Sequence, residues 1–303
     1  MNLENPKKFA MLVEQAKQIA DNFYRPISRK YDKAEHAYPK ELDMLASLLD
    51  GMNEGSSEAT GATSASKRPS TDGDSGVRNS GNLSAALGAM ELCRGDVGLL
   101  LSIPRQGLGN AAIGAVANDE QLARFKGKWA AMAITEPSCG SDSAAIRTTA
   151  VKEGDDYILN GEKIYVTAGA RAECVVVWAT LDKSLGKAAI KSFVVEHGTP
   201  GMEITRLEHK LGIKASDTAA ILFTNCRVPA ANLLGSPEID LKKGFASVME
   251  TFDNTRPLVA AMAVGVAAAS IERLKELLAG HIDANYGTLP LNASHAEATL
   301  YRL

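Results

Sequence analysis

The chain has 303 residues, 45% of them hydrophobic, and a formal net charge of −3 at pH 7. This length supports a large core and more than one substructure. The near-neutral charge argues against a nucleic-acid partner, because binding phosphates requires a basic face.

The cysteines and histidines indicate no metal centre. The four cysteines lie far apart without a Cys-x-x-Cys pair, and the five histidines are scattered. We therefore expect neither a zinc site nor a disulfide framework. The cysteines are expected to be free thiols in a reducing cytoplasm. The polar start, Met1 to Lys8, is no signal peptide, and the apolar run Leu258 to Ala269 is too short to span a bilayer. The expectation is a soluble cytoplasmic protein without a membrane span.

Residues 1–130 are predicted to form an N-terminal helical domain. Asn5-Pro6 suits the start of a helix that Pro26 would close, and a second helix runs from about Pro39 to Asp50, with Gly51 as its C-cap. Helical spacing returns from Leu83 to Trp129, where Asn118-Asp119 can cap a short helix.

Residues 52–82 interrupt these helices. They contain no Leu, Ile, Phe, Tyr or Trp, so they bury too little surface to offset the entropy of ordering. We predict a long mobile loop. Two readings of it stay open: a loop that borders the substrate pocket, and a surface loop without contact to the substrate.

Residues 131–235 change to a strand-like period. Short apolar runs alternate with turn signals, and Asn160-Gly161 suggests a hairpin turn. Regularly spaced short strands predict an antiparallel barrel or sandwich.

Residues 236–303 return to helix, and complete an α+β chain with a helical bundle at each end. Pro257 would start a new helix or kink a continuous one. A further helix with an apolar face is predicted to begin at Ala293, so we expect a C-terminally incomplete chain with a truncated C-terminal bundle.

Three segments carry most of the chemical information. They read Ala133-Ile134-Thr135-Glu136-Pro137-Ser138-Cys139-Gly140-Ser141-Asp142, then Asn160-Gly161-Glu162-Lys163-Ile164-Tyr165-Val166-Thr167, and finally Phe252-Asp253-Asn254-Thr255-Arg256-Pro257. Their order and separation resemble the acyl-CoA dehydrogenase family, whose first two segments read T-E-P-x-x-G-S-D and N-G-x-K-x-[WY]-[IV]-T. The resemblance runs from about Gly81 to about Leu278.

The resemblance implies FAD-dependent oxidation of an acyl-CoA thioester to its trans-2-enoyl form, as in fatty-acid β-oxidation. An α-proton is abstracted and the β-hydride passes to flavin N5. The residues implied to contact the flavin are Met132, Ala133, Ile134, Thr135, Gly140, Ser141, Tyr165, Val166 and Thr167. Thr135 would bond the pyrimidine edge and Thr167 would lie near N5, although Thr167 also suits an ordinary strand. Tyr165 stands where the family usually has Trp.

The acyl-CoA arm is implied to contact Ser141, Asp253, Asn254, Thr255 and Arg256. Arg256 could alternatively pair with Asp253 on the same helix. The resemblance also implies an electron-transfer flavoprotein-type acceptor and a homodimer or homotetramer.

The general base is missing from these segments. Most of the family carries a Glu near the C-terminus, and a minority carries it at the position of Thr255. Asp253 and Glu250 are weak substitutes. The segments that hold the FAD adenosine are also absent, so we expect an incomplete catalyst that binds FAD weakly. Two alternatives stay open: a non-catalytic subunit that assembles with a complete partner, and an acyl-CoA oxidase-type flavoenzyme.

Overall fold

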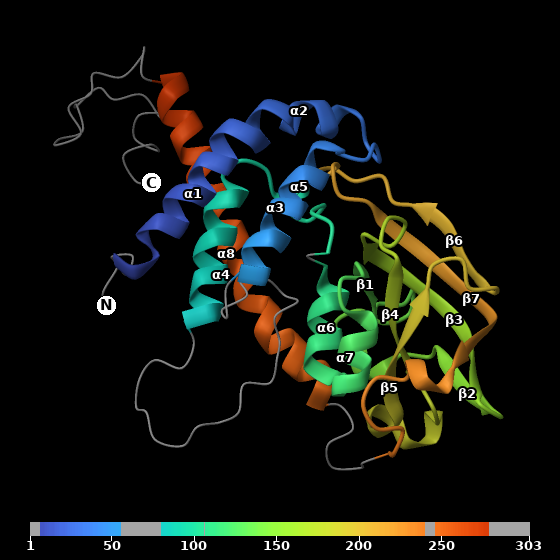
Figure 1. Ribbon diagram of the computed structural model, residues 1–303. Helices are drawn as coiled ribbons and strands as arrows, with labels where there is room; N and C mark the ends of the chain where they lie inside the picture. Colours follow the sequence, from blue (N-terminus) through green and yellow to red (C-terminus); the bar gives the residue numbers. More distant parts are fainter. Residues whose placement is uncertain (1–6, 56–79, 106, 240–245, 279–303) are drawn as a thin grey trace, which may run out of the picture.

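The structure is a computed structural model, and it describes residues 7–55, 80–105, 107–239 and 246–278. Most of the predicted loop, residues 56–79, lies outside the described residues, as do the predicted start at Asn5-Pro6 and the segment after residue 278. In the described part, a layer of long helices lies to one side, two short helices lie in the middle, and a curled sheet lies on the other side (Figure 1).

The N-terminal helices follow the predicted pattern with different ends. They are α1 (Ala10–Ile19), α2 (Arg25–Lys33), α3 (Glu41–Gly55), α4 (Ser80–Cys93), α5 (Val97–Leu100), α6 (Leu108–Val116) and α7 (Asp119–Phe125). The prediction that Pro26 closes a helix was wrong. A π-helical segment, Ala20–Tyr24, links α1 to α2, and Pro26 lies in the first turn of α2, where a missing N–H costs little. The end at Gly51 was also wrong, because α3 continues to Gly55.

The cap predicted for α7 is confirmed. The Asn118 side chain accepts a hydrogen bond from Gln121 N, and the Gln121 side chain accepts one from Asn118 N. This reciprocal pair satisfies two backbone donors that the first helical turn leaves open. Gln121 also donates to the carbonyls of Ala231 and Leu233, which ties α7 to the chain after the last strand.

The sheet has seven strands and mixed direction. They are β1 (Ala130–Ala133), β2 (Thr149–Glu153), β3 (Asp156–Thr167), β4 (Cys174–Thr180), β5 (Ile190–Glu196), β6 (Met202–Leu207) and β7 (Thr218–Pro229). The order is β1-β4-β2-β3-β7-β6, with β5 on β4. The predicted antiparallel sheet was wrong in part, because β1 and β2 pair with β4 in parallel. Alternating apolar residues indicate which side chains are buried, but not the strand direction.

Strand β4 is buried on both of its faces. Its alternate residues Cys174, Val176 and Trp178 join the core beneath α6 and α7, whereas Val175 and Val177 join the core inside the curl of the sheet. A strand covered on both sides is expected to be continuously apolar, as this one is. The fold is therefore built outward from β4.

Asn160-Gly161 is a bulge inside β3, not the predicted hairpin turn. The register with β7 shifts between Leu159 and Gly161, and the strand continues to Thr167. Gly161 has φ +154, and a Cβ there would lie 2.7 Å from Thr148 Cα. Glycine is required because β3 passes directly against the backbone of Thr148.

Helix α8 (Ala246–Leu278) is continuous, with Pro257 inside it. It packs along α4 and α6. Within it, Thr255–Leu277 contains an 18-residue window with a mean hydropathy of 1.5, and among the described residues this is the one helix long and apolar enough to cross a membrane by length and composition. This apolar stretch is longer than the run Leu258 to Ala269 considered from the sequence. Only 6% of the window is buried inside the described structure.

Gly265 sets how closely α8 approaches α4. A Cβ at this position would overlap the Met90 carbonyl, with the carbonyl carbon at 3.0 Å and Cys93 Cβ at 3.2 Å. The Met90 backbone cannot retreat without moving α4, so the two helices touch through glycine.

We predict that Gly265→Ala lowers the unfolding free energy by about 2 kcal/mol, because overpacking outweighs the gain of about 1 kcal/mol in helix propensity. Urea denaturation measures this difference. The matched control is Gly88→Ala in α4, where a Cβ would meet only Leu12 Cδ2 at 3.6 Å. Gly88→Ala should be neutral or stabilising, and equal stabilities for the two variants would contradict the close helix contact.

Candidate functional site

The chain leaves β1 through a tight turn. Glu136 N donates to the Cys139 carbonyl at 2.9 Å, and Cys139 N donates to the Glu136 carbonyl at 3.1 Å. Pro137 and Ser138 at the tip are exposed, as are the following residues Gly140 to Asp142. The turn therefore presents its hydroxyl groups at the surface.

Two of the predicted flavin segments lie side by side at this turn. Ile164 N, on β3, donates to the Thr135 carbonyl at 2.9 Å. The neighbouring Lys163 Nζ donates to the Ile134 carbonyl at 3.1 Å and to Glu136 Oε1 at 2.7 Å. Three consecutive residues after β1 are thus bonded to two consecutive residues of β3.

The ion pair Lys163–Glu136 is almost fully buried, with side-chain exposures of 0% and 4%. The Glu136 carboxylate also accepts hydrogen bonds from Arg147 N at 2.7 Å, Thr148 N at 2.9 Å and Thr148 Oγ1 at 2.6 Å. Such a buried pair is tolerated only when its remaining hydrogen-bonding capacity is satisfied.

Burial acts against the charge on both partners, but the outcome differs. At Glu136 burial alone would raise the pKa. The charge and hydrogen bond of Lys163, together with hydrogen bonds from the Thr148 side chain and the Arg147 backbone, nevertheless hold the pKa below its usual value. At Lys163 burial lowers the pKa, and Glu136 opposes this effect. The carboxylate is therefore ionised at neutral pH.

Sequence analysis did not assign a role to this pair. The available signal was the occurrence of a charged residue in each of two segments that are otherwise apolar or strand-like. Nothing in the sequence shows that the two charges meet, because that depends on β3 passing next to the end of β1.

Tyr165 has an unusual backbone at the centre of the second segment. Its φ is +58 at a register shift between Lys163 and Val166, and the residue is 62% exposed. A bulky residue with positive φ is strained, and such strain occurs preferentially at functional sites. Val166 is buried and Thr167 is half-buried. The bulge thus places a flat aromatic ring at the surface beside the hydroxyl-rich turn.

The residues of the turn fit a flat polar ligand. A Cβ at Gly140 would meet only Thr135 Cγ2 at 3.7 Å, so the fold itself does not require glycine there. Thr135 and Met132 are half-buried, and Ser141 is exposed. Ala133 and Ile134 are buried, so their part in binding would fall to backbone atoms. The aromatic side chain of Tyr165, the open space at Gly140 and the hydroxyls of Thr135 and Ser141 are together compatible with a bound isoalloxazine ring.

The third segment lies on α8. Asp253 and Arg256 are exposed and Thr255 is buried, while the side chain of Asn254 lies outside the described residues. Pro257 has no N–H to donate to the Asp253 carbonyl one turn earlier. Helix α6 packs against both β1 and α8, so it links the strand before the turn to the helix that carries this segment (Figure 1).

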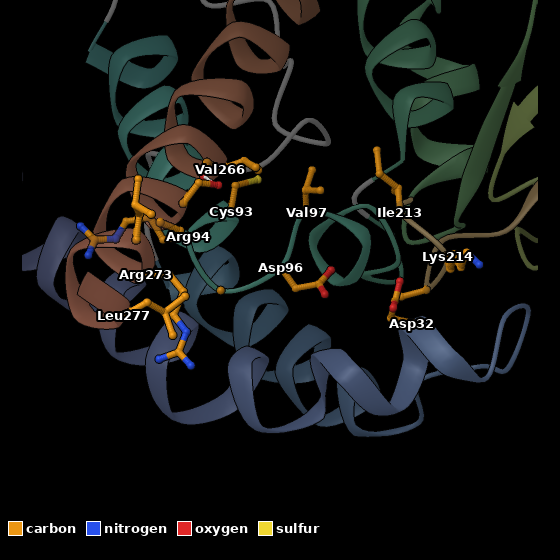
Figure 2. A pocket seen from close by; sticks show the side chains of 15 residues that line it. Asp32, Cys93, Arg94, Asp96, Val97, Ile213, Lys214, Val266, Arg273 and Leu277 are labelled. Atoms are coloured by element: carbon orange, nitrogen blue, oxygen red, sulfur yellow. Dashed lines mark hydrogen bonds between the residues drawn. The ribbon is translucent and has the colours of Figure 1, made fainter. Parts of the chain in front are cut away.

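A cavity of about 600 Å³ lies elsewhere, between the α4–α5 corner, residues 213–215 and the second half of α8 (Figure 2). In the described part of the chain, its lining includes none of the residues predicted for flavin or acyl-CoA. Arg94 in its wall pairs with Glu272 at 2.6 Å, and Asp96 caps α5 at Leu99 N. Burial raises the pKa of Cys93 to about 12, so this thiol is no nucleophile. We assign no chemistry to this cavity.

Lys163→Met should lower the unfolding free energy by about 3–5 kcal/mol at neutral pH, because it leaves a buried carboxylate unpaired. In the wild type the folded-state pKa of Glu136 is lowered, so its contribution is lost as the pH falls below about 4.5. In the variant the pKa should be raised instead, so acid should narrow the difference between the two proteins.

Urea denaturation at neutral pH and at about pH 4 measures this narrowing. Lys152→Met, on an exposed position of β2, is the matched control and should change stability by less than about 0.5 kcal/mol. The ion pair would be contradicted if Lys163→Met lost no more unfolding free energy than Lys152→Met. It would also be contradicted if the loss in Lys163→Met were the same at both pH values.

Comparison with known proteins agrees with the motif assignment. The sequence model described as "Acyl-CoA dehydrogenase, middle domain" matches residues 131–226. The chain is 42% identical over 148 residues to an acryloyl-CoA reductase (NADH) of Anaerotignum propionicum, which is 48% of this chain and 36% of that protein. It is 43% identical over 140 residues to the mitochondrial short-chain specific acyl-CoA dehydrogenase of Rattus norvegicus, which is 46% of this chain and 33% of that protein. The aligned region is thus well under half of each relative.

Solved structures extend the similarity to nearly the whole chain. Butyryl-CoA dehydrogenase of Megasphaera elsdenii superposes with a TM-score of 0.75 at 28% identity, covering 94% of this chain and 72% of that one. A chain from a structure described as the electron transferring flavoprotein of Acidaminococcus fermentans superposes with a TM-score of 0.74 at 32% identity, covering 94% and 71%. The helices, the mixed curled sheet and the long C-terminal helix are those of the same fold. The chain belongs to the acyl-CoA dehydrogenase family.

Proposed function

We propose that this chain carries the flavin-ring site and part of the thioester site of a protein that oxidises acyl-CoA to trans-2-enoyl-CoA with FAD. The observation that supports this most is the set of bonds from Lys163 and Ile164 to residues 134–136, which holds the two flavin segments together below the exposed Tyr165 ring.

The residues of this chain would orient the ligands. Thr135 would offer its hydroxyl to the pyrimidine edge, and Tyr165 and Thr167 would cover the opposite side, with Thr167 close to N5. A donor at the pyrimidine edge stabilises the negative charge that develops during reduction. When bound, FAD supplies the hydride acceptor.

The acyl-CoA arm would run from the β1 turn to α8. Ser141 can bond the amides and hydroxyls of the pantetheine, and Asp253 and Arg256 are exposed on α8. The same site, working in reverse, suits a reduction of enoyl-CoA, which the similarity to an acryloyl-CoA reductase favours as the second candidate.

Proton abstraction at the α-carbon requires a carboxylate that these segments do not supply. Thr255 is buried and has no acidic group, and Asp253 remains a weak substitute. We propose that the base comes from another part of the protein or from a neighbouring subunit of a homo-oligomer, and that an electron-transfer flavoprotein-type partner reoxidises the flavin.

Tyr165→Asn tests the ring. Asparagine tolerates positive φ, so the fold should be retained, but loss of the aromatic face should weaken FAD binding about fivefold. Quenching of FAD fluorescence measures the affinity. Val151→Asn, an exposed strand position on β2, is the control and should leave the affinity unchanged. Equal affinities for both variants would remove Tyr165 from the site.

The proposed reaction is tested by titrating the purified chain with FAD and then, without oxygen, with butyryl-CoA or crotonyl-CoA. We expect both to perturb the absorption of bound flavin, because the thioester would lie against the ring. FAD that binds but does not respond to either ligand would exclude acyl-CoA as the substrate. Bleaching that needs an added complete subunit would favour the alternative of a non-catalytic partner.

A further inference from the structure

A second cluster of side chains lies far from the β1 turn. Glu35 and His36 occupy the linker between α2 and α3, and His209 follows β6. One potential ligand atom from each of the three lies within 4.8 Å of the other two. Glu35 Oε2 is 3.0 Å from His209 Nδ1, and the two imidazole rings meet edge to face with their centroids 5.1 Å apart.

His36 is the unexplained member of this cluster. Both of its ring nitrogens are buried from solvent, and within the described part of the chain neither has a hydrogen-bond partner. Buried ring nitrogens without hydrogen-bond partners are costly, and an ordered water or ion is a common explanation for such atoms. The cluster therefore contains an unsatisfied ligand in addition to an ordinary Glu–His pair.

The backbone holds His36 in this position against its preference. Its φ is +68, a left-handed value that is uncommon outside glycine. Arg171 Nη2, from the segment before β4, donates to the carbonyls of His36 at 3.3 Å and Ala37 at 3.0 Å. Because strain of this kind persists only where surrounding contacts fix it, the linker is a defined structure.

We propose that Glu35, His36 and His209 form a binding site for a transition-metal dication of the zinc class, which joins the helical layer to the sheet. Two imidazoles and one carboxylate are the donor set that zinc accepts, with further positions open to water. His209 is 83% exposed, so its ring can turn to shorten the distances that a metal needs.

The charges around the cluster are compatible with a cation. Glu35 Oε1 accepts a hydrogen bond from Lys210 N at 2.8 Å, which holds this carboxylate beside the two imidazoles. Lys210 Nζ is directed to Ser216 O and to Thr218 Oγ1, the latter at 2.8 Å, while Arg171 pairs with Asp217 at 3.3 Å. Lys214 is the opposing charge, which makes the affinity lower than that of a closed structural zinc site.

The test is isothermal titration of the metal-free 303-residue chain with zinc chloride, together with the visible spectrum of the cobalt(II) complex. We expect one ion per chain and a rise in melting temperature with zinc concentration. Removing a ligand, as in His209→Ala or His36→Asn, should weaken zinc binding at least about tenfold. Both variants should fold, because His209 is an exposed side chain and asparagine tolerates the left-handed backbone at residue 36. His197→Ala, another exposed histidine, should bind like the wild type.

Each other result overturns the proposal. Absence of saturable zinc binding by the wild type excludes the site. Binding that His209→Ala and His36→Asn leave unchanged, or that His197→Ala weakens equally, shows that zinc is held elsewhere. The circular dichroism of His209→Ala and His36→Asn establishes that any loss of binding occurs in a folded chain. None of these measurements requires FAD or acyl-CoA, so the proposed metal site is tested independently of the proposed reaction.

Discussion

The buried ion pair between Lys163 and Glu136 is the interaction on which the proposed flavin site depends. Five of its hydrogen bonds join the end of β1, the end of the segment before β2, and the middle of β3. An apolar pair could fill the same volume, but it could not hold three backbone segments in one orientation. The charges therefore fix geometry more than they add stability. The turn after β1 and the bulge at Tyr165 are held in relative position because these bonds join residues 134–136 to Lys163 and Ile164.

Two residues with strained backbones lie at the two proposed sites. Tyr165 and His36 both have left-handed backbones, and both lie at a junction between segments that are distant in sequence. At Tyr165 a β-bulge turns an aromatic ring outward, and at His36 hydrogen bonds from Arg171 fix the linker. Gly161 shows the opposite case, because there the glycine is required by the approach of β3 to Thr148 and by no ligand.

The helical layer has a different role from the sheet. Helix α6 contacts both β1 and α8, so it transmits the position of the sheet to the helix that carries Asp253 and Arg256. Gly265 brings α8 against α4, and Val259, Val264 and Leu277 on α8 remain more than half exposed. The cavity beside the α4–α5 corner is framed by ion pairs that hold helices together. Its size does not make it the reactive site, because Arg94, Asp96 and Arg273 in its wall already bond to other residues of the helices.

The sequence by itself determined the family, the division into helical and strand-forming regions, and the three motif segments from which the flavin site is proposed. These are local properties: apolar periodicity, capping residues and short motifs are readable from consecutive positions. The tertiary structure decided the features that depend on pairing between distant residues. It set the parallel direction of β1 and β2 against β4, made Asn160-Gly161 a bulge, joined Lys163 to Glu136, and brought His36 beside His209. From the sequence, the scattered histidines indicated no metal site. Their separation along the chain carries no information on which side chains meet once the linker between α2 and α3 packs against the β6–β7 connection.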